Sequence, residues 1–280
     1  MVPATFEYHR PTSIDDAVKL LADLGDEARP LAGGHSLIPA MKLRLAQPTS
    51  LVDLGAIQEL RRIEEQGSHI SIGAMATHAE ILGSALLAAR CPLFPAAARH
   101  IGDTQVRNLG TIGGSLAHAD PAADWPAVVL ALDAEIIVAN ARARRTIPAH
   151  KFFIDVMQTS LEPGELLCEI RVAPTAATVA YVKTEQKASG FAVCGVAAVI
   201  DESASRVRIA ITGVAPFAYR ALASERALEG RKIDDAAIAD AARLAAEGVT
   251  PLGDIHASAD FRAHLAQVNT ARALRQAAAL

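Results

Sequence analysis

Cysteine is scarce in this sequence and is never clustered. The chain of 280 residues contains 3 cysteines, Cys91, Cys168 and Cys194, and none of them belongs to a CxxC motif. Cysteine-based zinc sites and iron–sulfur clusters need several thiolates at close spacing. The cysteines of this chain therefore cannot assemble either kind of centre, and we interpret them as reduced thiols of the core.

Long apolar runs and basic clusters are also lacking. The longest uncharged apolar segments, such as 125–132 and 191–200, fall well short of the roughly 20 residues that a membrane helix needs. Lys and Arg number 27 against 31 Asp and Glu, and no basic stretch is interleaved with aromatic residues. We therefore predict no membrane span and no nucleic-acid partner. The N-terminal MVPATFEYHRPTS has no secretory pattern, so we expect a cytoplasmic location.

Familiar catalytic motifs are missing as well. The 9 histidines form no HExxH pair, and no serine lies in GxSxG. The glycine-rich segments fit neither GxxxxGK[ST] nor GxGxxG, which disfavours a nucleotide P-loop and a Rossmann cofactor. His118 and Asp120 lie together near one of these segments, but a lone histidine is more often structural. We assign no catalytic residue to this chain.

Two glycine clusters are the most informative features that are present. Segment 105–124, QVRNLGTIGGSLAHADPAAD, places three glycines around Thr111, and segment 32–36 reads AGGHS. Glycines let several backbone N–H groups face one anion without an intervening side chain. Either cluster alone is equally typical of a tight turn. Together they predict a diphosphate site, and a tightly held dinucleotide would then perform the chemistry itself.

The first part of the chain mixes helices and strands. Ser13 is placed to cap a helix that ends at Gly25, and a strand is expected at 28–31. Ser36 is expected to cap a helix running through Arg44. Further along, a strand is expected at 50–54, a hairpin at 61–72, and a capping box at Thr77 followed by a helix over 81–89. Segment 110–121 is expected to be a loop before a helix at 125–132.

The pattern changes after a composition break at 173–177. Three strands are expected, followed by three alanine-rich amphipathic helices, so this part predicts three helices packed on a three-stranded antiparallel sheet. The strands are expected at 180–184, 192–201 and 206–214, and the helices at 221–228, 234–247 and 261–278. The sequence of this domain shows no obvious chemistry.

The two glycine segments also resemble a known family. AGGHSLIPAMKLR and RNLGTIGGSLAHADPAADWPAVVLAL are similar to the two flavin-binding signatures of the FAD-binding medium subunits of bacterial molybdenum hydroxylases, the xanthine dehydrogenase family. The similarity is greatest to the aerobic carbon monoxide dehydrogenase branch. It covers essentially the entire chain, including FEYHRPTSIDDAVKLL near the start and VRIAITGVAP in the last third.

This resemblance implies an α+β fold and a division of labour between chains. Residues 1–175 would form a two-subdomain FAD-binding domain of the vanillyl-alcohol-oxidase (PCMH) type, with α/β subdomains at about 1–55 and 56–175. Residues 176–280 would form the C-terminal domain of the CO dehydrogenase flavoprotein type. A large partner subunit would carry molybdopterin and a small one two [2Fe–2S] clusters, in a dimer of heterotrimers. The chain would be an oxidoreductase subunit that passes electrons through FAD to an external acceptor.

The resemblance also assigns cofactor-binding residues. Segments 32–36 and 111–115 would hold the FAD diphosphate through main-chain N–H groups and the hydroxyls of Ser36 and Thr111. Asp124 would accept hydrogen bonds from FAD hydroxyls. His35 is interpreted as orienting its loop rather than as a covalent flavin attachment. The full set is Ala32, Gly33, Gly34, His35, Ser36, Leu37, Ile101, Gly110, Thr111, Ile112, Gly113, Gly114, Ser115, Asp124, Leu167 and Lys183.

Three members of this set have structural alternatives. Ile101 would lie against the cofactor, the strand backbone at Leu167 would approach the flavin ring, and Lys183 would lie near the ring. The alternatives are a core isoleucine, a core strand leucine and a solvated lysine, because spacing alone does not orient a side chain.

Two other classes of function stay open. A self-sufficient FAD-dependent reductase or oxidase on the same fold would need its own substrate site and acid–base residue, and no substrate-recognition cluster is apparent. A flavin-less scaffold is disfavoured by the intact glycine segments and Asp124. The substrate of a multisubunit enzyme would be chosen by another chain.

Overall fold

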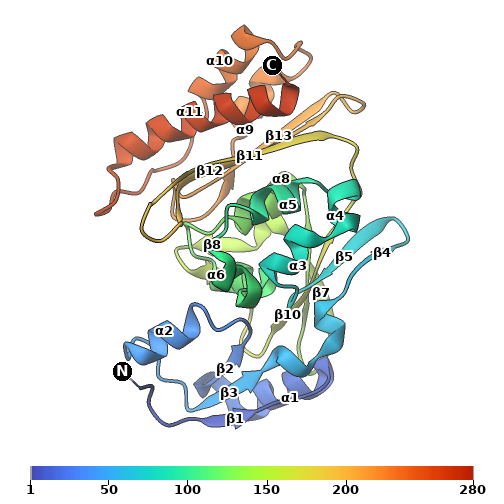
Figure 1. Ribbon diagram of the computed structural model, residues 1–280, viewed down its shortest axis with the longest axis vertical. Helices are drawn as coiled ribbons and strands as arrows, with labels where there is room; N and C mark the ends of the chain where they lie inside the picture. The colour runs from blue at the N-terminus through green and yellow to red at the C-terminus, as the bar shows by residue number, and fades with distance from the viewer. Residues whose placement is uncertain (1, 280) are drawn as a thin grey trace.

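The computed structural model describes residues 2–279, so Met1 and Leu280, the outer ends of the two expected domains, lie outside the described residues. The chain is arranged in three layers along its long axis (Figure 1). The N-terminal segment forms one end, the C-terminal segment forms the other, and the segment between them forms the middle layer. The middle layer can therefore share a site with either neighbour.

The N-terminal layer is a small parallel sheet of order β1–β3–β2, covered by helix α1. Helix α1 (Ile14–Leu24) begins as predicted, because the Ser13 side chain accepts a hydrogen bond from the Asp16 N–H. It ends at Gly25, whose φ of 66° favours glycine. The strands are β1 (Glu7–His9), β2 (Ala28–Leu31) and β3 (Ser50–Asp53).

Helix α2 (Leu37–Lys42) differs from the expectation. It stops before Arg44, and the Ser36 side chain makes no capping hydrogen bond. The reason lies in the backbone of Ser36, which is already helical (φ −105°, ψ −49°), whereas a capping serine needs the extended conformation. The Ser36 hydroxyl is therefore left available for another partner.

The middle layer is a five-stranded antiparallel sheet of order β4–β5–β10–β6–β7 with short helices packed beside it. The predicted hairpin is confirmed as β4 and β5. The strands of the five-stranded sheet are β4 (Ile63–Gln66), β5 (His69–Gly73), β6 (Glu135–Ala139), β7 (Arg144–Pro148) and β10 (Leu166–Val172). A separate two-stranded sheet consists of β8 (Phe153–Asp155) and β9 (Gln158–Thr159).

The helices of the middle layer include two departures from the expectation. The capping box at Thr77 is confirmed, but Ser84 begins a second helix by accepting a hydrogen bond from the Leu87 N–H, so one expected helix becomes two. Segment 110–121 is largely helical rather than a loop. The helices are α3 (His78–Gly83), α4 (Ala85–Arg90), α5 (Leu93–Ala98), α6 (Thr104–Leu109), α7 (Ile112–His118) and α8 (Trp125–Ala131).

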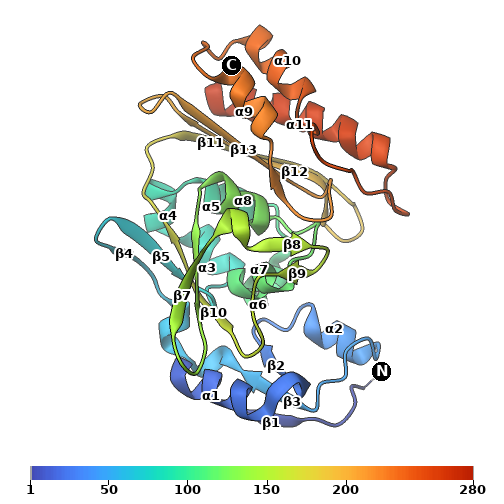
Figure 2. The ribbon, with the colours of Figure 1, turned by 180° about the vertical axis from the view of Figure 1, so that it is seen from behind.

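The C-terminal layer has the expected form with one additional strand. A two-residue strand β14 pairs with β13, and so short a strand leaves no periodic signal in the sequence. Helix α11 covers the outer face of the sheet (Figure 2), and α8 packs against β12 and β13 from the middle layer. The elements are β11 (Thr178–Glu185), β12 (Ala192–Asp201), β13 (Arg206–Thr212), β14 (Tyr219–Arg220), α9 (Leu222–Leu228), α10 (Asp235–Arg243) and α11 (Ala259–Ala278).

A charged cluster joins the C-terminal layer to the middle layer. Asp133, just after α8, forms ion pairs with three arginines of the C-terminal sheet, Arg206, Arg208 and Arg220. The shortest joins the Arg220 Nη1 to the Asp133 Oδ1 at 2.7 Å. The two layers are thus tied together at the C-terminal end of α8.

The three cysteines lie in the core with free thiols, as expected. Burial raises the pKa of Cys91 to about 11 and that of Cys168 and Cys194 to about 12, so all three stay protonated. No helix within residues 2–279 is long and apolar enough to cross a membrane.

Candidate functional site

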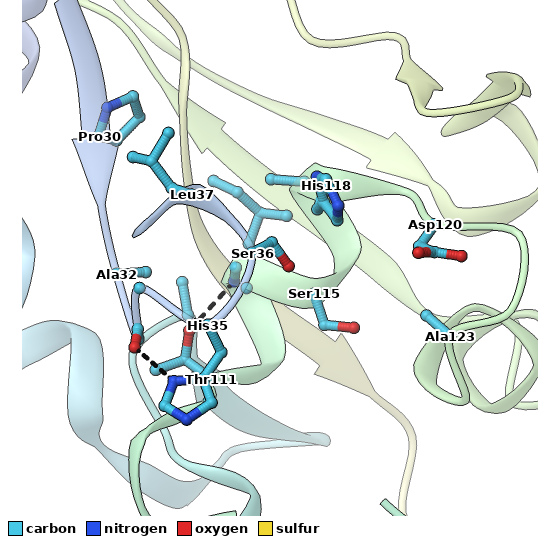
Figure 3. A pocket seen from close by; sticks show the side chains of 18 of the residues that line it. Pro30, Ala32, His35, Ser36, Leu37, Thr111, Ser115, His118, Asp120 and Ala123 are labelled. Atoms are coloured by element: carbon cyan, nitrogen blue, oxygen red, sulfur yellow. Dashed lines mark hydrogen bonds between the residues drawn. The ribbon is translucent and has the colours of Figure 1, made fainter. Parts of the chain in front are cut away.

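The two glycine segments meet in space and form the wall of one cavity of about 590 Å³ (Figure 3). A Cβ atom built on Gly33 would lie 2.2 Å from the Leu109 carbonyl oxygen and 2.8 Å from the Gly110 Cα. On the other segment, a Cβ on Gly114 would lie 3.3 Å from the Ala32 Cβ. Glycine is therefore required where the segments touch, which a pair of independent turns would not need.

The cavity gathers nearly all of the residues that the sequence assigned to the cofactor. All of them line it except Ile112 and Lys183. Ile112 is fully buried in the core of the middle layer, and Lys183 lies behind Asp124. Ile101 and Leu167 line the cavity and also pack on the core of the middle layer.

The first segment offers a row of free donors. Within residues 2–279, the N–H groups of Gly33, Gly34, His35 and Ser36 make no hydrogen bond. The His35 Nδ1–H donates to the Gly33 carbonyl at 2.9 Å, which joins the side chain to the backbone of its own loop. Gly34 has a φ of 72°, so the chain turns there in the left-handed region. Successive free N–H groups in such a turn suit an anion.

The second segment departs from the expected phosphate loop. Thr111 caps helix α7 by accepting a hydrogen bond from the Gly114 N–H at 3.2 Å. Most of the N–H groups that were expected to hold a diphosphate are therefore used within the protein: Ile112 donates to Ala76, Gly113 to Ala74 and Ser115 to Thr111. What this segment presents to the cavity is the hydroxyl groups of Thr111 and Ser115 (Figure 3).

Asp124 is held by two side chains from strand β11. The Lys183 Nζ lies 2.9 Å from its Oδ2, and the Tyr181 hydroxyl donates to its Oδ1 at 2.5 Å. The Lys183 Nζ also donates to the His100 carbonyl at 2.8 Å. Burial raises the pKa of Asp124, and Lys183 offsets part of that rise. Because the Lys183 side chain is only 1% exposed, the interpretation of Lys183 as a solvated lysine is wrong.

Sequence reasoning missed several residues in and around this site, and His78 and Tyr181 are the two with polar contacts that bear on its chemistry. His78, at the first position of α3, lines the cavity and was interpreted only as part of a capping box. Tyr181 lies two residues before Lys183 on the same strand, so both side chains point to the same face. That spacing was the available signal for Tyr181.

Comparison with known protein families identifies the family of this chain. The FAD binding domain in molybdopterin dehydrogenase matches residues 4–175, and the CO dehydrogenase flavoprotein C-terminal domain matches residues 179–277.

The chain belongs to the FAD-binding family of molybdopterin dehydrogenases.

Relatives of this family match the chain over its whole length. The carbon monoxide dehydrogenase medium chain of Hydrogenophaga pseudoflava is 43% identical over 99% of this chain and 98% of its own. The nicotine 6-hydroxylase medium subunit of Paenarthrobacter nicotinovorans is 37% identical over 97% of both chains. A solved carbon monoxide dehydrogenase structure from Hydrogenophaga pseudoflava superposes with a TM-score of 0.96 at 44% identity, covering 100% of this chain and 99% of that one.

These findings confirm the family resemblance and the expected α+β fold, and they make the chain an oxidoreductase subunit with FAD as its cofactor. The chemical groups that line the cavity are suited to FAD. The free N–H groups of 33–36 and the hydroxyls of Thr111 and Ser115 suit a diphosphate, and Ile101 and Leu167 offer apolar surface.

Proposed function

We propose that this chain is the FAD-binding electron-transfer subunit of a multisubunit molybdenum hydroxylase. It passes electrons from the [2Fe–2S] clusters of a partner subunit through FAD to an external acceptor. The observation that carries this proposal is the single cavity formed where the two family signatures touch at Gly33 and Gly110. Bound FAD supplies the redox chemistry, and the chain supplies binding and orientation.

Each side of the cavity has a separate role in this proposal. The N–H groups of 33–36 and the hydroxyls of Ser36, Thr111 and Ser115 hold the diphosphate. Asp124 accepts hydrogen bonds from FAD hydroxyls, because each of its oxygens keeps one lone pair beyond those used by Lys183 and Tyr181. Ile101 and the backbone at Leu167 face the flavin ring, and Lys183 contributes its charge from behind Asp124.

The partners follow from the relatives, which are medium chains or subunits of larger enzymes. A large subunit carries molybdopterin and chooses the substrate, a small one carries the [2Fe–2S] clusters, and the whole is a dimer of heterotrimers in the cytoplasm. Three free, buried cysteines fit a reducing compartment. The chain divides into an FAD-binding domain, 1–175, and a C-terminal domain, 176–280. The second has a hydrophobic cluster of its own, while the core of the middle layer also takes in Tyr181, Val199 and other residues of the C-terminal sheet that pack against it.

The protein purified from flavin-replete cells is expected to be yellow and to release FAD on acid denaturation. FMN has a single phosphate and would leave one side of the two-segment site without a partner. Chromatography of the released flavin, with authentic FAD and FMN as standards, makes this measurement. Folded protein that contains FMN, or that contains no flavin and takes up none, would contradict the assignment of the cavity.

Affinity purification of the tagged chain from its native host is expected to bring down two further subunits in equal amounts, one containing molybdenum and one containing iron and acid-labile sulfide. Gel filtration of the complex should give the mass of two heterotrimers. Recovery of a homo-oligomer that oxidises its substrate at the full rate would favour the self-sufficient flavoenzyme instead.

A further inference from the structure

His78 lies in the cavity wall beside the contact between the two glycine segments. Its backbone N–H donates to the Gly110 carbonyl at 3.0 Å, and its ring lies so close that a Cβ on Gly110 would be 2.7 Å from the His78 Nε2. Gly110 in turn touches Gly33. The imidazole therefore reaches the point at which both signatures contribute to the cavity.

The indole of Trp125 fixes which nitrogen of His78 carries the proton. The Trp125 Nε1–H donates to the His78 Nδ1 at 3.0 Å, and the rings lie 5.7 Å apart. An indole N–H can only donate, so the His78 Nδ1 must be unprotonated. A neutral imidazole that is bare at Nδ1 carries its hydrogen at Nε2. Trp125 is fully buried, which holds this geometry in place.

The ring is also kept neutral. Burial lowers the pKa of His78 to about 4, and the positive charges of His35 and Arg107 add to this effect. Within residues 2–279, no protein group accepts a hydrogen bond from the His78 Nε2, although His78 is only 5% exposed. A donor that has no protein partner and lies in the wall of a ligand cavity is suited to a ligand acceptor.

We propose that His78 contacts the cofactor directly, donating its Nε2–H to an acceptor atom of FAD, and that Trp125 is a positioning residue that fixes this tautomer. The inference rests on the proposed function, because it takes FAD as the occupant. The proposal adds a hydrogen-bond donor from α3 to a site whose other donors come from the two glycine segments, 32–36 and 110–115.

The tautomer is tested by long-range ¹H–¹⁵N NMR on the full chain labelled with ¹⁵N-histidine, with His78→Gln used to assign the signal. At pH 7 the His78 Nδ1 is expected to be unprotonated and Nε2 protonated, and adding FAD should shift the Nε2–H signal. Trp125→Phe should allow both tautomers. A protonated Nδ1 at pH 7, or an Nε2–H signal that FAD does not move, overturns the proposal.

Affinity is tested by titrating FAD-free protein with FAD and following flavin fluorescence. His78→Leu is expected to weaken binding about tenfold, or about 1.4 kcal/mol, whereas His78→Gln, whose amide N–H can replace Nε2–H, should stay within about threefold. His264→Leu, at an exposed position of α11, is the matched control and should bind as wild type. Wild-type affinity in a folded His78→Leu protein overturns the proposal. Failure of the proposed function would appear separately, as wild-type protein that binds no FAD.

Discussion

Replacing Gly33 with valine is expected to empty the FAD site while leaving most of the fold intact. The Gly33 backbone has no left-handed φ, so the effect comes from contact rather than from strain. A Cβ there would lie 2.2 Å from the Leu109 carbonyl oxygen, a backbone atom that cannot rotate away. The two segments must move apart, and the free donors of 33–36 then lose their position opposite Thr111. FAD affinity should fall at least tenfold, or about 1.4 kcal/mol or more.

Fluorescence titration with FAD measures this loss, and circular dichroism checks the fold. The matched control is Gly83→Ala, because a Cβ on Gly83 has no atom within 4 Å and its φ is ordinary. That variant should bind FAD as the wild type does. If Gly33→Val also bound FAD normally, the glycines would only make turns, and the contact between the segments would have no part in binding.

Replacing Lys183 with methionine is expected to destabilise the protein by about 3–5 kcal/mol. The ion pair with Asp124 is almost fully buried, and removing one partner leaves an uncompensated charge in the core. The pKa of Asp124, already raised by burial, should rise further once Lys183 no longer opposes it. FAD binding should weaken as well, since Asp124 loses one of the two side chains that orient it.

Urea unfolding measures the stability, and two further variants separate the causes. Adding Asp124→Asn to Lys183→Met removes the stranded charge and should recover part of the lost stability. Lys151→Met, at an exposed position, should change stability by less than about 0.5 kcal/mol. A loss below about 1 kcal/mol for Lys183→Met would mean that the pair acts like a surface ion pair.

Local signals in the sequence were enough for most elements of the fold. Ser13 and Thr77 each bring their capping partner within a few residues, and Gly25 supplies the left-handed turn that ends α1. Ser36 failed as a cap because its backbone conformation is set by the packing of its loop rather than by its own preference. The helix at α7 was missed for a related reason: Gly113 tolerates helix, turn and loop alike, and its contact with Ala74 decides among them.

In the candidate site, too, the features encoded by local motifs could be predicted from the sequence, and the long-range contacts could not. Its glycine segments carry recognisable motifs, so nearly all of the residues that the sequence assigned to the cofactor line the cavity, although other segments complete its wall. The contacts that set its chemistry join residues far apart in the chain: Asp124 to Tyr181, and His78 to Trp125. No spacing rule connects such pairs, because the start of α8 meets strand β11 and the start of α3 only through tertiary packing.

Anaerobic spectroscopy of the FAD-loaded chain tests most directly whether it relays electrons or has a substrate site of its own. Carbon monoxide, an N-heterocycle and an aldehyde should each leave the flavin absorbance of the isolated chain unchanged, while dithionite should bleach it. Adding the molybdenum and iron–sulfur subunits should make the substrate of that complex bleach the same flavin. Rapid bleaching of the isolated chain by an organic substrate would contradict the account and identify a stand-alone flavoenzyme.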